Sequence, residues 1–220
     1  MKTMLITLAL SLTSCSAFGH YIWIEPESPN QANLYFGEWH NGEVETEDGR
    51  LSRIQANNIT PSTHVQSIDR QHDHIAIHLK QPGDFAITEA QSPRIKKNRT
   101  DSVRHVLLAR TGRNHTQSWL EFDLTPTVKD SQTFTLTYQG KPLAKSRVTV
   151  MAPNRWQKSF KTDQNGQITI QTPWKGFYLL KAKYIDNRPG KVGQKPYDQT
   201  EYNLTLTFRT SQGIPWNNAN

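Results

Sequence analysis

The chain has 220 residues, 35% of them hydrophobic, with 26 lysines and arginines against 19 aspartates and glutamates and a formal charge of +7. This length allows one large or two small domains with hydrophobic cores. After the first twenty residues no apolar run is long enough to cross a bilayer, so the composition excludes an integral membrane protein.

The amino terminus has the pattern of a secretory signal. Lys2 is its only charge, an apolar run continues to Leu12, and small residues follow up to Ala17 and again at Gly19. Charged, apolar and small-residue regions in this order direct export, and the apolar run is too short to be a membrane span. We therefore expect residues 1–19 to be removed and the mature, periplasmic protein to begin with His20.

Two other ways of processing this terminus stay open. Cleavage after Ala17 would leave Phe18-Gly19-His20, in which the amine, two amides and the imidazole can bind Cu(II) or Ni(II) in a square plane. Leu12-Thr13-Ser14-Cys15 fits the lipobox pattern, and lipidation of Cys15 would make the protein a membrane-anchored lipoprotein. Cys15 is the only cysteine, so no disulfide is expected in the mature chain. In an exported protein the positive charge indicates contact with anionic envelope surfaces, or only solubility, rather than binding to nucleic acid.

Short alternating apolar runs separated by turn residues recur along the chain, and no long 3.6-residue period occurs, which predicts an all-β protein. The segment from Gly42 to Arg70 is predicted to be mainly loop, and the run from Asn187 to Gln199 an exposed loop. The expected strands are 21–24, 32–39, 74–79, 84–89, 103–109, 132–138, 144–151, 157–162, 167–172, 176–184 and 202–210.

A domain boundary is expected where Leu124-Thr125-Pro126-Thr127 interrupts the apolar pattern. The predicted architecture is two β-sandwich domains, immunoglobulin-like or prealbumin-like, in tandem after the cleaved signal. Residues 20–127 would form the amino-terminal sandwich with the candidate metal site, and residues 128–220 the carboxyl-terminal sandwich.

The second half contains turns with a recognisable chemistry. Gly140 and Gly166 are placed where turns need a positive φ, and Asp163 can accept hydrogen bonds from the amides of the turn that follows it. The string Gly140-Lys141-Pro142-Leu143-Ala144, together with 148–150, 161–170 and 176–180, resembles the pattern of prealbumin-like and Cna-B-like β-sandwiches. That resemblance implies a fold and no particular function.

A wider resemblance includes the amino terminus. The string His20-Tyr21-Ile22-Trp23-Ile24-Glu25-Pro26, the segments 106–109 and 120–122, and the terminal run 201–208 together resemble a family of bacterial periplasmic domains of unknown function that is associated with cobalt and nickel uptake. Members open with a similar string directly after the signal, which favours cleavage after Gly19. The resemblance implies binding or delivery of a divalent metal ion and, as a partner, an envelope transporter for cobalt or nickel.

His20 is the first candidate ligand, because the new α-amine would add a second donor to its imidazole. A site for Ni, Co, Cu or Zn needs two or three donors that converge at about 2.0 to 2.2 Å from the ion. The further candidates are His40, His74 and His105 as ligands, with Glu25 and Glu38 as carboxylates that could orient an imidazole.

The position of each histidine in the sequence gives a different reason to include it in a metal site or to leave it out. His40 follows the second expected strand, where the resembling family commonly has a Gly-His pair, although Glu38 and Trp39 separate it from Gly37. His74 and His78 share one face of a strand but lie about 13 Å apart along it, so at most one of them joins a site. His105 directly precedes an apolar run and could face inward.

No G-x-S-x-G, H-E-x-x-H or P-loop string occurs, so no enzyme is predicted. The predicted function is that of a periplasmic divalent-metal-binding protein that supports nickel or cobalt uptake. Two alternatives remain: a non-catalytic structural or ligand-binding envelope module, and a copper oxidoreductase that uses His20 as a histidine brace. The sequence does not select the ion, because copper and nickel bind most nitrogen and oxygen sites well.

Overall fold

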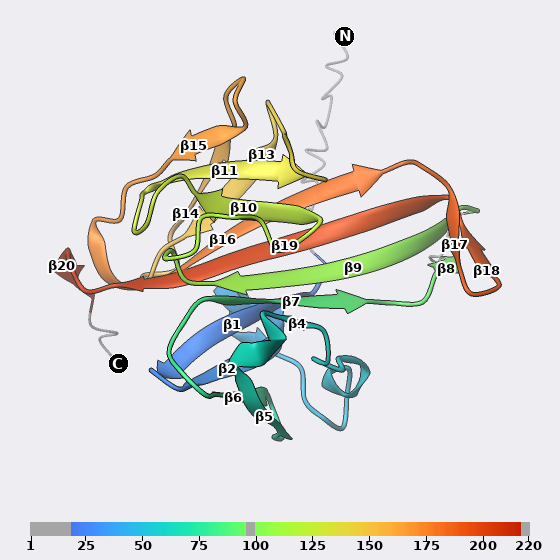
Figure 1. The fold of residues 1–220 in the computed structure, drawn as a ribbon, viewed down its shortest axis with the longest axis horizontal. Coiled ribbons are helices and arrows are strands. Elements are labelled where there is room, and N and C mark those ends of the chain that lie inside the picture. Colours follow the sequence, from blue (N-terminus) through green and yellow to red (C-terminus); the bar gives the residue numbers. More distant parts are fainter. Residues whose placement is uncertain (1–18, 96–99, 217–220) are drawn as a thin grey trace, which may run out of the picture.

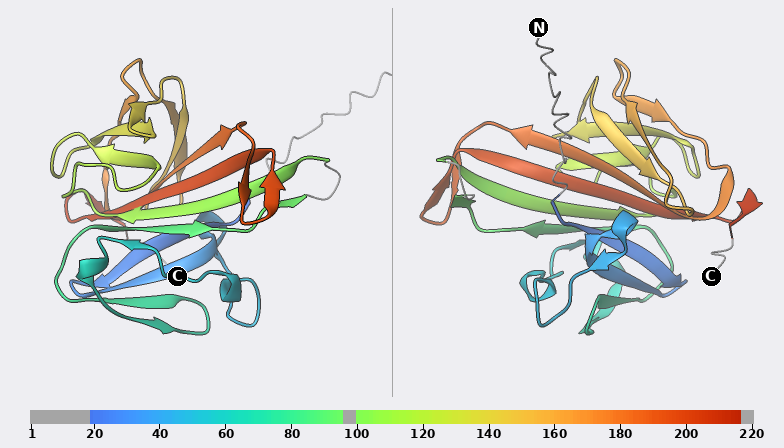
Figure 2. Two further views of the ribbon diagram at one scale, coloured as in Figure 1. Left: turned by 45° about the vertical axis from the view of Figure 1, so that its right-hand side comes forward. Right: turned by 180° about the vertical axis from the view of Figure 1, so that it is seen from behind.

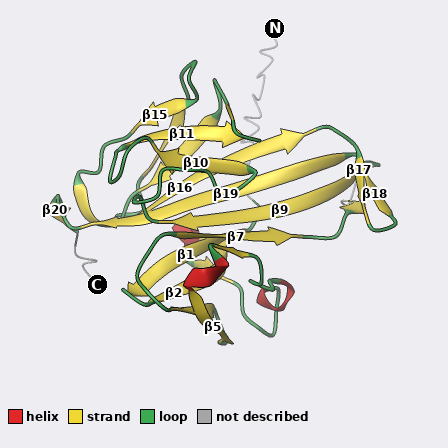
Figure 3. Cartoon of the chain, viewed as in Figure 1, coloured by secondary structure: helices red, strands yellow, loops and turns green. Residues whose placement is uncertain are grey.

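The computed structural model describes residues 19–95 and 100–216, and almost all of its regular structure is β-strand (Figure 3). The remaining regular elements are three single-turn 3₁₀ helices: η1 (Trp39–Asn41), η2 (Leu51–Arg53) and η3 (Ser62–His64). The prediction of an all-β sandwich fold is therefore confirmed. The predicted signal up to residue 18, including the alternative lipidation site Cys15, lies outside the described residues.

Three sheets are stacked, and the middle one is the largest (Figures 1 and 2). This central sheet has the strand order β14-β13-β16-β19-β9-β7-β4, with β8 on β9 and β20 on β16. Its strands are β4 (Ile59–Thr60), β7 (Phe85–Ala90), β8 (Arg94–Ile95), β9 (Ser102–Thr111), β13 (Arg147–Met151), β14 (Gln157–Lys161), β16 (Trp174–Asp186), β19 (Gln199–Thr210) and β20 (Ile214–Pro215).

An amino-terminal sheet covers part of one face of the central sheet. Its order is β1-β2-β6-β5, and β3 pairs with β2. Two hydroxyls tie β1 to the central sheet, because Thr205 Oγ1 donates to the carbonyl of Ile22 at 2.8 Å and Thr207 Oγ1 to that of Ile24 at 2.6 Å. The strands are β1 (Tyr21–Ser28), β2 (Gln31–Glu38), β3 (Glu43–Val44), β5 (Val65–Arg70) and β6 (Ile75–Leu79).

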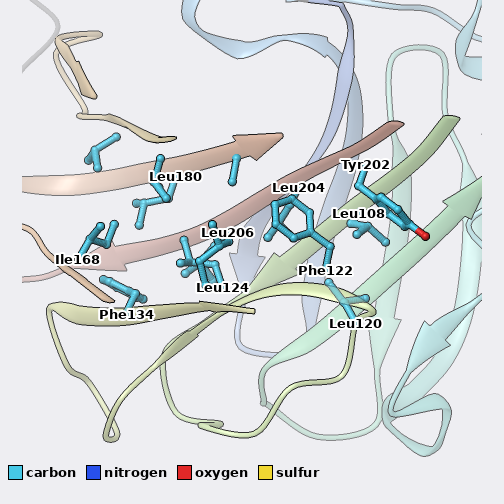
Figure 4. Packing of buried hydrophobic residues seen from close by; sticks show 14 of the residues in the cluster. Leu108, Leu120, Phe122, Leu124, Phe134, Ile168, Leu180, Tyr202, Leu204 and Leu206 are labelled. Atoms are coloured by element: carbon cyan, nitrogen blue, oxygen red, sulfur yellow. The ribbon is translucent and has the colours of Figure 1, made fainter. Parts of the chain in front are cut away.

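A carboxyl-terminal sheet covers the opposite face. It has the order β10-β11-β12, with β15 on β11, and its core includes Phe122, Phe134, Leu180 and Leu204 (Figure 4). Its strands are β10 (Phe122–Pro126), β11 (Thr133–Tyr138), β12 (Lys141–Pro142) and β15 (Gln167–Thr169). A separate hairpin of β17 (Gly190–Val192) and β18 (Lys195–Tyr197) forms within the segment that was predicted to be an exposed loop.

The central sheet is apolar on both faces because its side chains alternate between two cores. On β9, Val106 and Leu108 join the core under the carboxyl-terminal sheet, whereas Leu107 and Ala109 join the core under the amino-terminal sheet. A strand that is buried on both faces has a continuous apolar run rather than an alternating one. The run from Val106 to Ala109 has this composition.

The two sandwiches share the central sheet, and they do not follow one another along the chain as the tandem prediction implied. β9, from the first half, pairs in parallel with β19, from the end of the chain. β10 lies before the boundary predicted at residue 127 and pairs with β11 beyond it. Pro126, which suggested an interruption, is the last residue of β10, and β10 is at the edge of its sheet. Proline is tolerated there because an edge strand does not need every amide.

The predicted turn chemistry is present. Gly140 and Gly166 have φ values of +73° and +72°, and Asp163 Oδ1 accepts hydrogen bonds from the amides of Asn165 at 2.9 Å and Gln167 at 2.8 Å. Among the residues that the structure describes, no helix has the length and hydropathy needed to cross a membrane.

Candidate metal centre

The centre forms where the chain doubles back beside the start of β1. Gly42, in the left-handed region with a φ of +72°, ends η1 and donates its amide to the carbonyl of Trp39 at 3.1 Å. β3 then returns along β2, and the amide of Glu45 donates to the carbonyl of Phe36 at 2.8 Å. Gly37 permits this close return, since a β-carbon there would collide with the carbonyl oxygen of Glu43.

This return brings two carboxylates to the imidazole of His20. His20 Nε2 lies 2.7 Å from Glu45 Oε1 and 3.1 Å from Glu43 Oε1. The His20 and Glu45 side chains are 17% and 15% exposed, whereas Glu43 is 51% exposed. Arg50 Nε lies 3.3 Å from Glu45 Oε1. One imidazole and two carboxylates therefore form a half-buried group that opens to solvent on the Glu43 side.

The donor atoms of this group lie close enough together for one divalent transition-metal ion to bind all three residues. One ligand atom from each residue lies within 4.8 Å of the other two, and ligands at about 2.1 Å in a tetrahedral site are roughly 3.4 Å apart. His20 Nε2 is buried and makes no hydrogen bond of acceptable geometry, although carboxylate oxygens are close to it. An imidazole nitrogen with two carboxylate oxygens suits Zn, Ni or Co and provides no soft sulfur ligand.

The orientation of the His20 ring bears on the histidine-brace alternative. A chelate between an α-amine and the imidazole of the same residue uses Nδ1, because only Nδ1 is near enough to the backbone to close the ring. The carboxylates instead face Nε2. The described geometry thus favours an imidazole and dicarboxylate centre over an amine and imidazole brace.

The other candidate histidines do not belong to this three-residue group. His40 lies on η1, and burial, followed by the charge of Lys181, lowers its pKa below the usual value. His74 Nδ1 lies 2.7 Å from Asp73 Oδ1. His105 lies on β9, where its Nδ1 is 3.7 Å from Glu201 Oε2, and it lines the same cavity as His20.

The two carboxylates proposed to orient an imidazole have other partners. Glu25 Oε1 accepts hydrogen bonds from the indole Nε1 atoms of Trp23 at 2.9 Å and Trp39 at 3.0 Å. Glu38 Oε2 accepts one from Asn41 Nδ2 at 2.9 Å. Glu25 thus joins two buried tryptophans and supports packing.

Sequence reasoning missed Glu43 and Glu45, because the pattern from Gly42 to Arg70 predicts mainly loop. A signal was present. In Glu43-Val44-Glu45 the two carboxylates are two residues apart, which places them on the same side of an extended segment. The glycine before them marks a reversal toward β2. What the pattern lacked was any indication that this segment returns to His20.

Comparison with known proteins gives one partial match. No curated protein and no solved structure matches the chain. Residues 122–186, which extend from β10 to the end of β16 and do not include the centre at His20, match the family described as a domain of unknown function, DUF4198.

Proposed function

We propose that the chain is an exported, periplasmic protein that binds one divalent transition-metal ion through His20, Glu43 and Glu45 and supports uptake of nickel or cobalt without catalysing a reaction. The observation that carries this proposal is the convergence of the Glu43 and Glu45 carboxylates on a buried imidazole nitrogen of His20 that lacks a well-directed hydrogen bond. Cleavage after Gly19 would place this centre at the first residue of the mature protein.

The arrangement suits a protein that takes up an ion and passes it on. Three protein ligands leave coordination positions of the ion open, and sites with open positions exchange ligands more readily than closed structural ones. Glu43 is half exposed and lies at the solvent side of the group. A transporter could therefore replace Glu43 before the more buried His20 and Glu45 release the ion.

The preference for nickel or cobalt rests on the resemblance of the amino-terminal motif. The donor set itself admits Zn and Cu as well, and the Irving–Williams order favours copper at such sites. Selection in the periplasm would then follow metal supply and coordination geometry.

Calorimetric titration of the metal-free mature protein with Ni²⁺, Co²⁺, Zn²⁺ and Cu²⁺ tests the proposal. We expect one ion per chain. The isosteric double variant Glu43→Gln and Glu45→Gln should lower the affinity by at least about tenfold, since changes even in outer-shell partners cost that much. The His20→Ala variant should abolish stoichiometric binding. Glu27→Gln, an exposed glutamate on β1 outside the group, is the control and should bind as the wild type does.

A form of the protein that keeps extra residues before His20 distinguishes binding through the α-amine from binding through the imidazole and the two carboxylates. If the α-amine is a ligand, this extension abolishes binding, whereas an imidazole and dicarboxylate centre retains most of it. Unchanged affinity in the His20 and glutamate variants, with near-ultraviolet circular dichroism showing intact folding, would refute the proposal.

A further inference from the structure

A cavity of about 570 Å³ lies beside the His20 centre, on the face of the central sheet that also carries β1. Thr205 and Thr207 attach this face to Ile22 and Ile24. Asn203, two residues before Thr205 on β19, and His20, directly before β1, both line the cavity. β1 begins beside the cavity, and β19 of the central sheet begins four residues before Asn203, at Gln199. A concavity of this volume is in the range of sites for small organic ligands.

The lining of this cavity is strongly cationic. Its basic residues come from η2 and the residue before it, from β8, from β13 and from β16: Arg50, Arg53, Arg94, Arg147, Lys181 and Lys183. Elements far apart in the sequence thus direct like charges toward one space. Such a concentration focuses a positive potential into the cavity.

Acidic side chains neutralise only part of this charge. Arg50 pairs with Glu45 at 3.3 Å, and Lys183 Nζ lies 3.0 Å from Glu201 Oε2. Arg53, Arg94 and Arg147 have no carboxylate within 4.0 Å among the residues that the structure describes, and all three are exposed. A ligand could therefore reach their guanidinium groups without displacing an internal partner.

The types of residue indicate the chemistry of the ligand. Guanidinium groups present planar pairs of donors that match carboxylate and phosphate oxygens. Phe36 and Leu107 add apolar surface to the same lining, which suits a carbon skeleton rather than a bare inorganic ion. Burial lowers the pKa of Lys181 to about 8, so an added anion would also offset the cost of holding that ammonium group away from water.

We propose that this cavity is a binding site for a small organic anion with two or more carboxylate or phosphate groups, held by Arg53, Arg94 and Arg147. The site goes beyond the proposed metal centre, and its anion should bind to the metal-free protein. Because His20 belongs to both, an ion at His20 and an anion in the cavity would alter each other's affinity by the same factor.

The test uses metal-free mature protein and calorimetric titration with citrate, with fructose 1,6-bisphosphate and with uncharged glucose. We expect one citrate or one bisphosphate per chain and no binding of glucose. Preference for citrate assigns the carboxylate class, and preference for the bisphosphate assigns the phosphate class. The double variant Arg94→Gln and Arg147→Gln should weaken binding by at least about tenfold, because charge-assisted hydrogen bonds are lost.

The matched control is Lys129→Gln with Lys141→Gln, which removes the same charge from exposed positions outside the cavity. Equal weakening in the control and the arginine variant would show a general charge effect and overturn the proposal, as would the absence of binding by either anion. Nickel titration of the arginine variant keeps the two proposals apart. If the wild type binds nickel but binds neither anion, the cavity site alone is refuted. Loss of nickel binding in the His20 variant but not in the arginine variant would show that nickel binds at His20 and not in the cavity.

Discussion

The buried pair of Arg110 and Asp123 gives the sharpest prediction for stability. Both side chains are 0% exposed, and Arg110 Nη1 lies 2.8 Å from Asp123 Oδ2. The guanidinium also donates to the carbonyls of His115 at 2.5 Å and Gln117 at 3.2 Å. The carboxylate accepts hydrogen bonds from the amides of Trp119 at 2.9 Å and others nearby. The pair thus holds the connection from β9 to β10, which joins the central and carboxyl-terminal sheets.

The change Asp123→Asn keeps the size of the side chain and removes its charge. The guanidinium of Arg110 is then left buried without a counter-charge, which costs about 3 to 5 kcal/mol of unfolding free energy. At about 2 to 4 °C per kcal/mol for a chain of this length, the melting temperature should fall by roughly 6 to 20 °C. The cost of about 3 to 5 kcal/mol is a large part of the total free energy of unfolding, which is about 5 to 15 kcal/mol for a domain.

Thermal and urea unfolding of the wild type, Asp123→Asn, Arg110→Met and the double variant measure this cost. The double variant should lose less than the sum of the single variants, because it leaves no unpaired charge. Glu47→Gln is the control. It breaks the more exposed pair of Glu47 and Arg70, whose closest atoms are 2.7 Å apart, and should lower the melting temperature far less. Equal losses in Asp123→Asn and Glu47→Gln would refute the reasoning.

Two further predictions concern a buried charge and a turn. Burial lowers the pKa of Lys181 from 10.5 to about 8; above pH 8 the unfolded chain keeps a proton that the folded chain has lost, so stability increases with pH. Lys181→Met should therefore stabilise the protein by on the order of 1 to 2 kcal/mol below pH 8, and urea unfolding should show this advantage shrinking above pH 8. If the stability gain of Lys181→Met did not change with pH, the buried charge of Lys181 would not be its cause. Gly166→Ala should cost about 1 to 3 kcal/mol, because its β-carbon would lie 2.9 Å from Leu136 O and Leu143 N. Gly140→Ala has nearly the same φ with nothing within 4 Å, so an equal melting temperature for both variants would exclude the steric contribution.

Much of the fold could be predicted because its signals are local. Alternation of apolar residues located most strands of the three sheets, and the predicted roles of Gly140, Gly166 and Asp163 in turns are confirmed. The strands that were missed have weaker patterns. β5 is an edge strand whose side chains are mostly exposed, and β10 ends in a proline that suggested a boundary.

The candidate site was predicted only in part. His20 was singled out from its position after the signal-like segment, and it lies in the only group of three converging His, Cys, Asp or Glu side chains found among the described residues. His40, His74 and His105 were chosen by residue type and proximity to strands, which carry no information on distance in space. The pairing of β3 with β2, which brings Glu43 and Glu45 to His20, depends on a reversal that local patterns do not specify.

The sequence by itself predicted most of the strands, the turns and His20 as a candidate ligand, because each of these predictions depends on residues that are near one another in the chain. Only the tertiary structure decided that the two sandwiches share one sheet, since β9 and β19 meet across nearly one hundred residues of chain. The same long-range pairing assembles the cationic cavity and places it beside His20. Contacts of this kind depend on how complete sheets pack and register, so no short segment encodes them.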